Sequence, residues 1–190
     1  MTDLDFCILD WIQAHLRCGV LDYLMPRITV LGNAGIFWIL ITCVLMIIPR
    51  TRRLGVASAL ALMLDLLLVN LTIKPLVNRI RPYDLREGIT LLIKAPTDSS
   101  YPSGHTAASF AAAFSLLLSA RRQLLSDRMG LVLGIPSVVL AALIAASRLY
   151  LYVHYPSDVL GGLICGLLCG TLGAVLAAKI VRKFYRNRQI

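Results

Sequence analysis

Charged residues are scarce in this chain. They make up 15% of its 190 residues, whereas 58% of the residues are hydrophobic, and the mean hydropathy is +0.77. Soluble domains carry about 25% charged residues, and too little polar sequence remains here to cover a soluble core of this size. The composition therefore excludes an ordinary soluble domain and favours the lipid bilayer as the surroundings of this chain.

Lysine and arginine are absent from five apolar windows, in which Asp65 is the single acidic residue. Each window approaches the roughly 20 residues that a helix needs to cross the hydrocarbon core of a bilayer. The windows cover residues 28–48, 54–73, 104–120, 129–147 and 159–178. They predict an all-α, polytopic transmembrane helical bundle with five spans, folded as a single domain over residues 1–190.

A secretory signal peptide is not expected, because Asp3, Asp5 and Asp10 stand where a signal peptide has a basic region. Residues 4–16 alternate apolar side chains with acids and His15, and this segment is too short and too polar to span a bilayer. We expect a short amphipathic helix at the membrane interface, which brings the expected helices to six.

The net charge of +9 does not indicate nucleic-acid binding, because the basic residues lie mainly in short segments between the windows. Eleven of the nineteen lysines and arginines fall on one side of a five-span topology, which should be the cytoplasmic side. They are Arg50, Arg52, Arg53, Arg121, Arg122, Arg128, Lys179, Arg182, Lys183, Arg186 and Arg188. We therefore expect a multi-pass protein of the cell membrane, with a cytoplasmic C-terminus and with loop 74–103 and turn 148–157 facing outward.

Small residues mark the last window, where Gly162, Gly166 and Gly170 recur at four-residue spacing. Such a face lets another helix approach closely. The partner is either a helix of the same bundle or a second copy of the chain in a homodimer. The five cysteines show no metal-ligand spacing, so no metal site is predicted.

The first of three polar clusters contains Lys74 and Arg81, which would share a helix face if the helix continued to Pro82. Arginine suits bidentate contact with phosphate oxygens, and lysine supplies a compact positive charge. Attraction of both side chains to anionic lipid headgroups is the alternative interpretation.

The second cluster stands at the start of the third window. Ser103 is suited to be the N-cap of a helix, and Gly104 leaves the backbone open to close approach. The Ser103 hydroxyl and the Gly104 amide could hold phosphate oxygens at this helix N-terminus, with His105 in the first turn. Alternatively, His105 is only an interfacial side chain.

The third cluster joins the fourth and fifth windows and contains Arg148, His154 and Asp158. Pro156 suits the start of a helix, which places Asp158 in the first turn. Asp158 could then accept a hydrogen bond from one ring nitrogen of His154 and leave the other nitrogen free as a nucleophile. A structural pair at the membrane surface is the alternative.

The predicted topology places all three clusters on the outward side, where together they supply the groups that phosphoryl transfer requires. The pattern Lys-x6-Arg-Pro, Pro-Ser-Gly-His and Ser-Arg-x5-His-x3-Asp, at residues 74–82, 102–105 and 147–158, resembles the signature of the type-2 phosphatidic acid phosphatase superfamily. Every signature position is matched. The resemblance implies a helical bundle that hydrolyses lipid phosphates without a metal or other cofactor, although the family usually has six spans.

Carried over by position, the resemblance implies a role for each signature residue. His154 would be the nucleophile that forms a phosphohistidine, Asp158 its orienting partner, and His105 the acid that protonates the leaving oxygen. The residues that would bind the phosphate are Lys74, Arg81, Ser103, Gly104 and Arg148.

We therefore expect a phosphatase for a lipid phosphate or diphosphate at the outer membrane face. Undecaprenyl diphosphate is favoured as substrate, because an outward site suits recycling of a wall-carrier lipid; phosphatidylglycerol phosphate and phosphatidic acid are alternatives. A lipid-phosphate binding or transport protein is the rival from another class, but a binder has no need of an oriented imidazole at His154. A transferase that passes the phosphoryl group to another acceptor also fits, and Asp65 either makes a hydrogen-bonded packing contact or aids substrate access.

Overall fold

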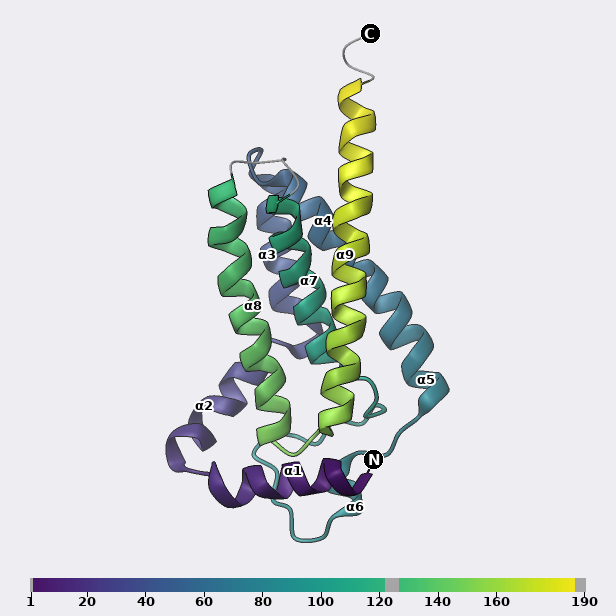
Figure 1. Ribbon diagram of the computed structural model, residues 1–190. Coiled ribbons are helices and arrows are strands. Elements are labelled where there is room, and N and C mark those ends of the chain that lie inside the picture. Colours follow the sequence, from purple (N-terminus) through teal and green to yellow (C-terminus); the bar gives the residue numbers. More distant parts are fainter. Residues whose placement is uncertain (1, 122–126, 187–190) are drawn as a thin grey trace.

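The computed structural model describes residues 2–121 and 127–186, and this part of the chain forms helices and loops without a strand. The helical segments, in chain order, are α1 (Thr2–His15), α2 (Gly19–Val30), the 3₁₀ helix η1 (Asn33–Gly35), α3 (Ile36–Ile47), α4 (Arg52–Asp65), the π-helix η2 (Leu66–Ile73), α5 (Lys74–Val77), α6 (Pro82–Leu85), α7 (Gly104–Arg121), α8 (Asp127–Tyr150) and α9 (Pro156–Arg186). Figure 1 shows α3, α4, α7, α8 and α9 as the bundle, with α1 lying across one end of it.

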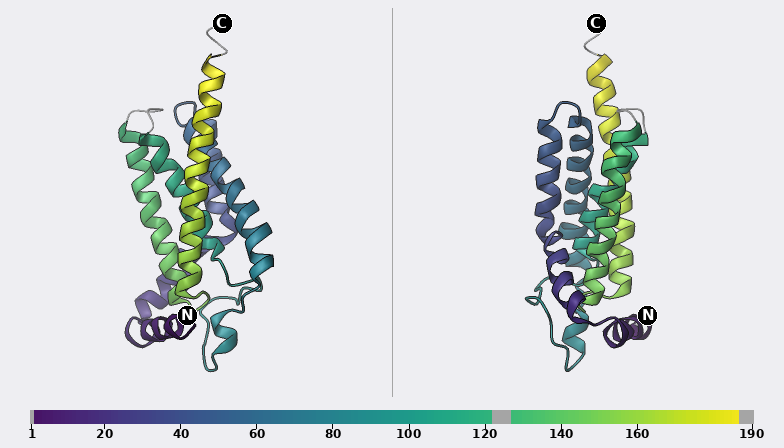
Figure 2. Two further views of the ribbon diagram at one scale, coloured as in Figure 1. Left: turned by 45° about the vertical axis from the view of Figure 1, so that its right-hand side comes forward. Right: turned by 90° about the vertical axis from the view of Figure 1, so that its left-hand side faces the viewer.

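Small side chains place α7 at the centre of the bundle. Ala107, Ala111 and Ala112 are fully buried, and α7 contacts α3, α4, α8 and α9. Alanine allows these neighbours to approach closely, and dispersion contacts and packing then hold the helices together in lipid. The two views of Figure 2 show an elongated bundle in which α9 extends beyond its neighbours at the C-terminal end.

The glycines of the last window lie against this central helix. A Cβ atom at Gly162 would stand 2.6 Å from the Ser103 carbonyl oxygen, and one at Gly166 would stand 2.6 Å from the Ala107 carbonyl oxygen. Only glycine permits that approach, so these residues allow α9 to pack against α7. The small-residue face thus contacts a helix of the same bundle, as one of the two interpretations held. A homodimer through Gly162, Gly166 and Gly170 stays a prediction.

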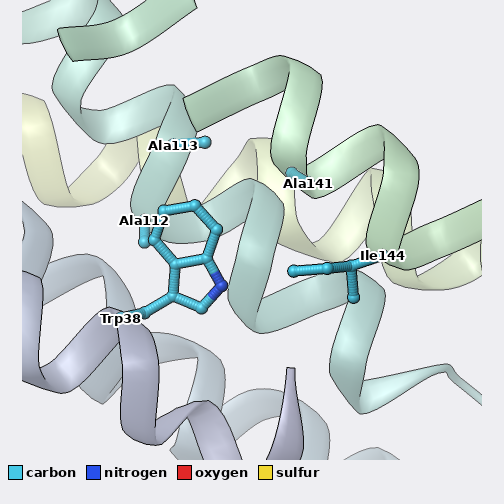
Figure 3. Close-up of a cluster of buried hydrophobic side chains, with 5 residues drawn as sticks. All are labelled: Trp38, Ala112, Ala113, Ala141 and Ile144. Carbon is cyan, nitrogen blue, oxygen red and sulfur yellow. The ribbon is translucent and has the colours of Figure 1, made fainter. Parts of the chain in front are cut away.

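Trp38 of α3 fills the space between α3, α7 and α8. Its side chain packs with Ala112, Ala141 and Ile144 (Figure 3), and its indole N–H donates a hydrogen bond of 2.9 Å to the Ser109 hydroxyl. The buried ring nitrogen is therefore satisfied, as a tryptophan in an apolar interior requires.

Three helices of the described chain are long and apolar enough to cross a bilayer, namely Arg52–Leu85, Leu131–Tyr150 and Pro156–Lys183. The helices Gly19–Val30 and Asn33–Ile47 form a fourth candidate only if they are taken as one span, and they are bent by 44°. Positive φ angles at Ala34 and Gly35 accompany the bend, and Gly104–Ser119 is shorter than a full span. The structure confirms an all-helical fold with several apolar helices but does not confirm the count of five spans plus one amphipathic helix.

The second predicted span departs from a regular helix before it reaches the first polar cluster. It continues from α4 into the π-helix η2, and α5 ends at Val77; the next residue, Asn78, adopts a left-handed conformation with φ 42°. The condition under which Lys74 and Arg81 would share a helix face is therefore not met, because a left-handed residue cannot continue a right-handed helix to Pro82. Residues 79–81 are free to turn toward the bundle.

A helix, α1, is present where the N-terminal amphipathic helix was predicted, although its place at a membrane interface stays a prediction; α2 follows it as a helix that the windows did not reveal. All three polar clusters lie at the end of the bundle that carries α1, opposite the C-terminal end of α9 (Figure 1). Of the basic residues that defined the expected cytoplasmic side, Arg122 and Arg188 lie outside the described residues.

Candidate active site

The three sequence clusters meet in space. The Arg81 Nη1 atom lies 3.3 Å from Nε2 of His154, which joins the first cluster to the third. The Ser103 N–H donates a hydrogen bond of 3.0 Å to the Asp158 carbonyl oxygen, which joins the second to the third. A Cβ atom at Gly104 would stand 3.5 Å from Nζ of Lys74, so the first and second clusters are neighbours as well.

His154 and Asp158 form the predicted pair at a tight turn between α8 and α9. Pro156 begins α9 and places Asp158 in its first turn, as the sequence predicted. Nδ1 of His154 lies 3.4 Å from Oδ2 of Asp158, and both side chains are buried. This hydrogen bond is long, and it leaves Nε2 of His154 directed toward Arg81.

Burial keeps the imidazole of His154 neutral. Removal from water lowers its pKa to about 3; the Asp158 hydrogen bond opposes this shift, and the charges of Arg148 and Arg81 reinforce it. A neutral ring that donates from Nδ1 presents a lone pair at Nε2. His154 is therefore in the protonation state of a nucleophile throughout the physiological pH range.

Asp158 is held by more partners than His154 alone. Its Oδ2 accepts hydrogen bonds from the Ser100 hydroxyl at 2.5 Å and from the Tyr155 N–H at 2.9 Å. Its Oδ1 accepts one from Nη1 of Arg79 at 2.6 Å. These contacts fix the carboxylate and so fix the ring that it faces. Sequence reasoning missed Ser100 and Arg79, although the position of Arg79 inside the first cluster was an available signal.

Asp5 of α1 extends this network to the N-terminal helix. It is 4% exposed; its Oδ2 accepts from Nη2 of Arg79 at 3.0 Å, and its Oδ1 accepts from the Ser157 N–H at 3.0 Å. The Arg79 guanidinium also stacks over the Tyr155 ring, 4.0 Å from its centroid. α1 is therefore more than an interfacial helix, because its buried acid holds the arginine that holds Asp158.

Replacing Asp5 with asparagine should lower kcat roughly 10-fold to 100-fold and leave KM nearly unchanged, since small displacements of a catalytic group cost rate rather than binding. Steady-state phosphate release by detergent-purified protein measures both constants. Asp3→Asn is the matched control, because Asp3 lies on the same helix and is exposed. Equal rates for the two variants would show that Asp5 does not position Asp158.

Lys74 and Arg81 are nearly buried, at 9% and 3% exposure, and share one carboxylate. Nζ of Lys74 forms an ion pair with Oδ2 of Asp98, and Nη2 of Arg81 binds Oδ1 of Asp98 at 2.7 Å. Burial alone would raise the pKa of Asp98, but these two cations outweigh it and hold the pKa well below its usual range. Sequence reasoning did not identify Asp98.

Three further predicted site residues lie at the same end of the bundle, and each has its own partner: Arg148, His105 and Ser103. Arg148 is 2% exposed; its Nη1 donates to the Thr29 hydroxyl at 2.6 Å, while its Nε has no partner among the described residues. Nε2 of His105 lies 2.9 Å from Oδ1 of Asn33. The buried Ser103 hydroxyl accepts from Thr106 at 3.0 Å and keeps its own proton for another acceptor.

An apolar cavity of about 840 Å³ opens from this site. Lys74, Asp98 and His105 line its polar end, and it continues between α3 and α4. The side chains along it are Ile39, Thr42, Cys43, Met46, Leu62, Met63, Asp65, Leu66 and Asn70. A cavity of this size, mostly apolar with a few polar groups at one end, has the character of a ligand site.

Asp65 is buried, as predicted, and faces this cavity. Its Oδ1 has no hydrogen-bond partner in the part of the chain that the structure describes. The hydrogen-bonded packing contact considered from the sequence is therefore not formed at this oxygen. Over the same residues, no cluster of three histidine, cysteine, aspartate or glutamate side chains could hold a metal ion.

These features define a helical membrane protein with a cationic site beside an oriented histidine. Residues 52–182 match the model of the PAP2 superfamily, and the chain belongs to that superfamily. An undecaprenyl-diphosphatase of Sulfolobus acidocaldarius is 33% identical over 146 residues, which are 77% of this chain and 66% of the relative. The alignment thus spans just under two thirds of that relative's length.

Two solved structures share the fold. The crystal structure of a transmembrane PAP2-type phosphatidylglycerolphosphate phosphatase from Bacillus subtilis superposes with a TM-score of 0.76 at 26% identity, covering 94% of this chain and 87% of the other. Aquifex aeolicus LpxE superposes with a TM-score of 0.72 at 29% identity, covering 90% and 94%. The relative from Sulfolobus acidocaldarius is thus named as a diphosphatase, and the Bacillus subtilis neighbour as a phosphatidylglycerolphosphate phosphatase.

Proposed function

We propose that this protein is a lipid phosphatase of the cell membrane that removes a phosphate group through a phosphohistidine at His154. The proposal rests on one observation: a polar site and an apolar cavity adjoin at one end of the bundle. There, a buried histidine backed by a fixed carboxylate lies beside Arg81, with two further buried cations, Lys74 and Arg148, at the same end of the bundle. The same site opens into a mostly apolar cavity between α3 and α4. A headgroup fits the first feature and a lipid tail fits the second.

The chemistry follows from the groups present. Nε2 of His154 attacks the phosphorus atom, the bond to the leaving oxygen breaks, and His105 gives that oxygen a proton. Asp158 accepts the hydrogen bond from Nδ1 and stabilises the positive charge that develops on the ring. Water then attacks the phosphohistidine; His105 takes a proton from it, and phosphate leaves with His154 restored.

The oxygens of the transferring group need positive charge and hydrogen-bond donors around them. Lys74, Arg81 and Arg148 supply the charge, and the Nε of Arg148, which has no partner among the described residues, is a buried donor that a phosphate oxygen would satisfy. The Ser103 hydroxyl and the Gly104 amide at the start of α7 add neutral donors. Each of these five residues was expected from the sequence to bind phosphate.

Undecaprenyl diphosphate is the substrate that we favour. The relative from Sulfolobus acidocaldarius carries that activity in its name, and a mostly apolar cavity of about 840 Å³ offers space for part of an isoprenoid tail. Phosphatidylglycerol phosphate is the second candidate, because the Bacillus subtilis neighbour is a phosphatase for that lipid. The excess of basic residues in segments 50–53, 121–128 and 179–188, which the five-span topology places on the side opposite the site, supports a site on the extracytoplasmic side and a cytoplasmic C-terminus.

Phosphate release by detergent-purified protein in excess EDTA tests the proposal. We expect release from undecaprenyl diphosphate to be fastest when it is compared with phosphatidylglycerol phosphate and phosphatidic acid at equal mole fraction in mixed micelles. Product analysis in the presence of an alcohol acceptor separates hydrolysis from transfer. A folded protein that binds these lipids and releases no phosphate from any of them would instead be a binding or transport protein.

A further inference from the structure

Asp98 lies in the candidate site, but the proposed mechanism gives it no role. Its carboxylate lies between the Lys74 ammonium and the Arg81 guanidinium and pairs with both. Nε of Arg81 also donates to the Asp98 carbonyl oxygen at 2.9 Å. An oxyanion bound by these two cations has the contacts that a phosphate group makes with lysine and arginine.

Asp98 differs from the cations in exposure. Its side chain is 54% exposed, whereas those of Lys74 and Arg81 are 11% and 4% exposed. The two cations are therefore fixed parts of the bundle, and the carboxylate reaches them from the surface. A carboxylate in that place repels an incoming phosphate and occupies donors that the phosphate needs.

Asp98 also has space into which it can withdraw. It borders the apolar cavity and also a second cavity of about 470 Å³, which is lined by residues 78–81, 83–84 and 95–99. The loop is anchored on either side of it, since Tyr83 donates to the Pro96 carbonyl oxygen at 2.5 Å and the Arg79 N–H donates to the Ser99 hydroxyl at 3.0 Å. A local change at residues 97–98 would move the carboxylate and leave both anchors intact.

We propose that Asp98 is an internal competitor of the substrate phosphate: its carboxylate occupies the Lys74–Arg81 site until a phosphate group displaces it. This inference rests on the proposed function, because it assigns the same two cations to the phosphate. Displacement favours groups that carry more negative charge and more oxygens than one carboxylate. Asp98 thereby selects phosphate monoesters and diphosphates over the singly charged phosphodiesters that abound in membranes.

Inorganic phosphate binding by the full-length protein tests the inference without any need for turnover. Asp98→Asn keeps the shape of the side chain and removes its charge, so we expect the variant to bind phosphate about tenfold more tightly than the wild type. The dissociation constant is obtained from the rise in Tm with phosphate concentration in detergent. Asp84→Asn is the matched control, since Asp84 borders the second cavity and is exposed. This substitution should leave the phosphate affinity unchanged.

The opposite sign would overturn the inference. If Asp98 only orients Lys74 and Arg81, its neutralisation weakens phosphate binding; equal or weaker binding by Asp98→Asn therefore rules out competition. If the variant does not fold, hydrogen exchange of the wild type decides instead. Phosphate should speed amide exchange at residues 97–98 as the carboxylate is released, whereas slower exchange there would contradict displacement.

The inference and the proposed function can fail independently of each other. Tighter phosphate binding by Asp98→Asn without phosphate release from any lipid would support the competitor and reject the phosphatase. Lipid phosphate release with no gain in phosphate affinity would support the phosphatase and reject the competitor.

Discussion

His154→Ala should lower phosphate release by about 10³-fold or more, because the mechanism depends on its Nε2 to attack the phosphorus atom. Inorganic phosphate should still raise the Tm of this variant, since Lys74, Arg81 and Arg148 remain in place. His15→Ala is the matched control, because His15 is an exposed histidine of α1 and should not affect the rate. Steady-state assays on the three proteins measure the effect.

Direct capture of the intermediate completes this test. Quenching a reaction in alkali, in which phosphohistidine survives, should yield a phosphorylated peptide that contains His154 in the wild type and no such peptide in His154→Ala. A fully active alanine variant, or a phosphopeptide that contains His105 alone, would show that the nucleophile has been misassigned.

The same substitution should change how stability depends on pH. The folded pKa of His154, about 3, is below the value of about 6.5 for an unfolded chain. Between these values the unfolded chain binds more protons, so the contribution of His154 to stability is lost as the pH falls below about 6.5. The Tm of the wild type should therefore fall more steeply between pH 7 and pH 5 than that of His154→Ala.

Asp158→Asn should lower kcat by roughly 10³-fold to 10⁴-fold, the loss seen when the acid of a comparable histidine pair is neutralised. The introduced amide oxygen would keep the hydrogen bonds from Ser100 and Tyr155 only if the amide nitrogen faced the Arg79 guanidinium, donor against donor. The substitution thus removes the charge that stabilises the His154 imidazolium. It also replaces the Oδ1 acceptor of the Arg79 guanidinium with an amide nitrogen.

A graded comparison separates orientation from general damage. Ser100→Ala removes one hydrogen bond to the same carboxylate and keeps its charge, so we expect a loss of only about tenfold. KM for the lipid should change little in both variants, because neither residue contacts the phosphate. Activity of Asp158→Asn within tenfold of the wild type would contradict an orienting role for this carboxylate.

The helical fold and the positions of the three polar clusters along the chain were predictable because they depend on local patterns; the roles of the cluster residues stay predictions. Long apolar windows predict helices whatever their neighbours are, and Pro156 together with the spacing of His154 and Asp158 predicts a pair at a helix start. The predicted count of spans was not confirmed, because the apolar part of α7, Gly104–Ser119, is shorter than a full span and the first window falls on two helices that are bent by 44°. The bend at Ala34 and the left-handed turn at Asn78 depend on how the neighbouring segments pack.

The surrounding network was not predictable for a related reason. Asp5, Arg79, Ser100 and Asp98 are ordinary polar residues in sequence, and each lies many positions from its partner in the site: Asp5 is 152 residues from Ser157, and Arg79 is 79 residues from Asp158. Nothing in the spacing along the chain relates these pairs. Asp5 meets Ser157 because α1 packs against the α8–α9 turn, and Arg79 and Ser100 meet Asp158 because the segment between α5 and α7 packs there as well.

The sequence by itself determined that the chain is a bundle of apolar helices and that three polar clusters carry the groups of phosphoryl transfer, because hydropathy and motif spacing are properties of short segments. Tertiary structure alone decided that the clusters meet, that the glycines of α9 serve α7, and that Asp98 occupies the site of two cations. These facts depend on packing and on charge interactions between segments that are far apart in the chain. Burial of these segments removes the water that would otherwise screen their charges.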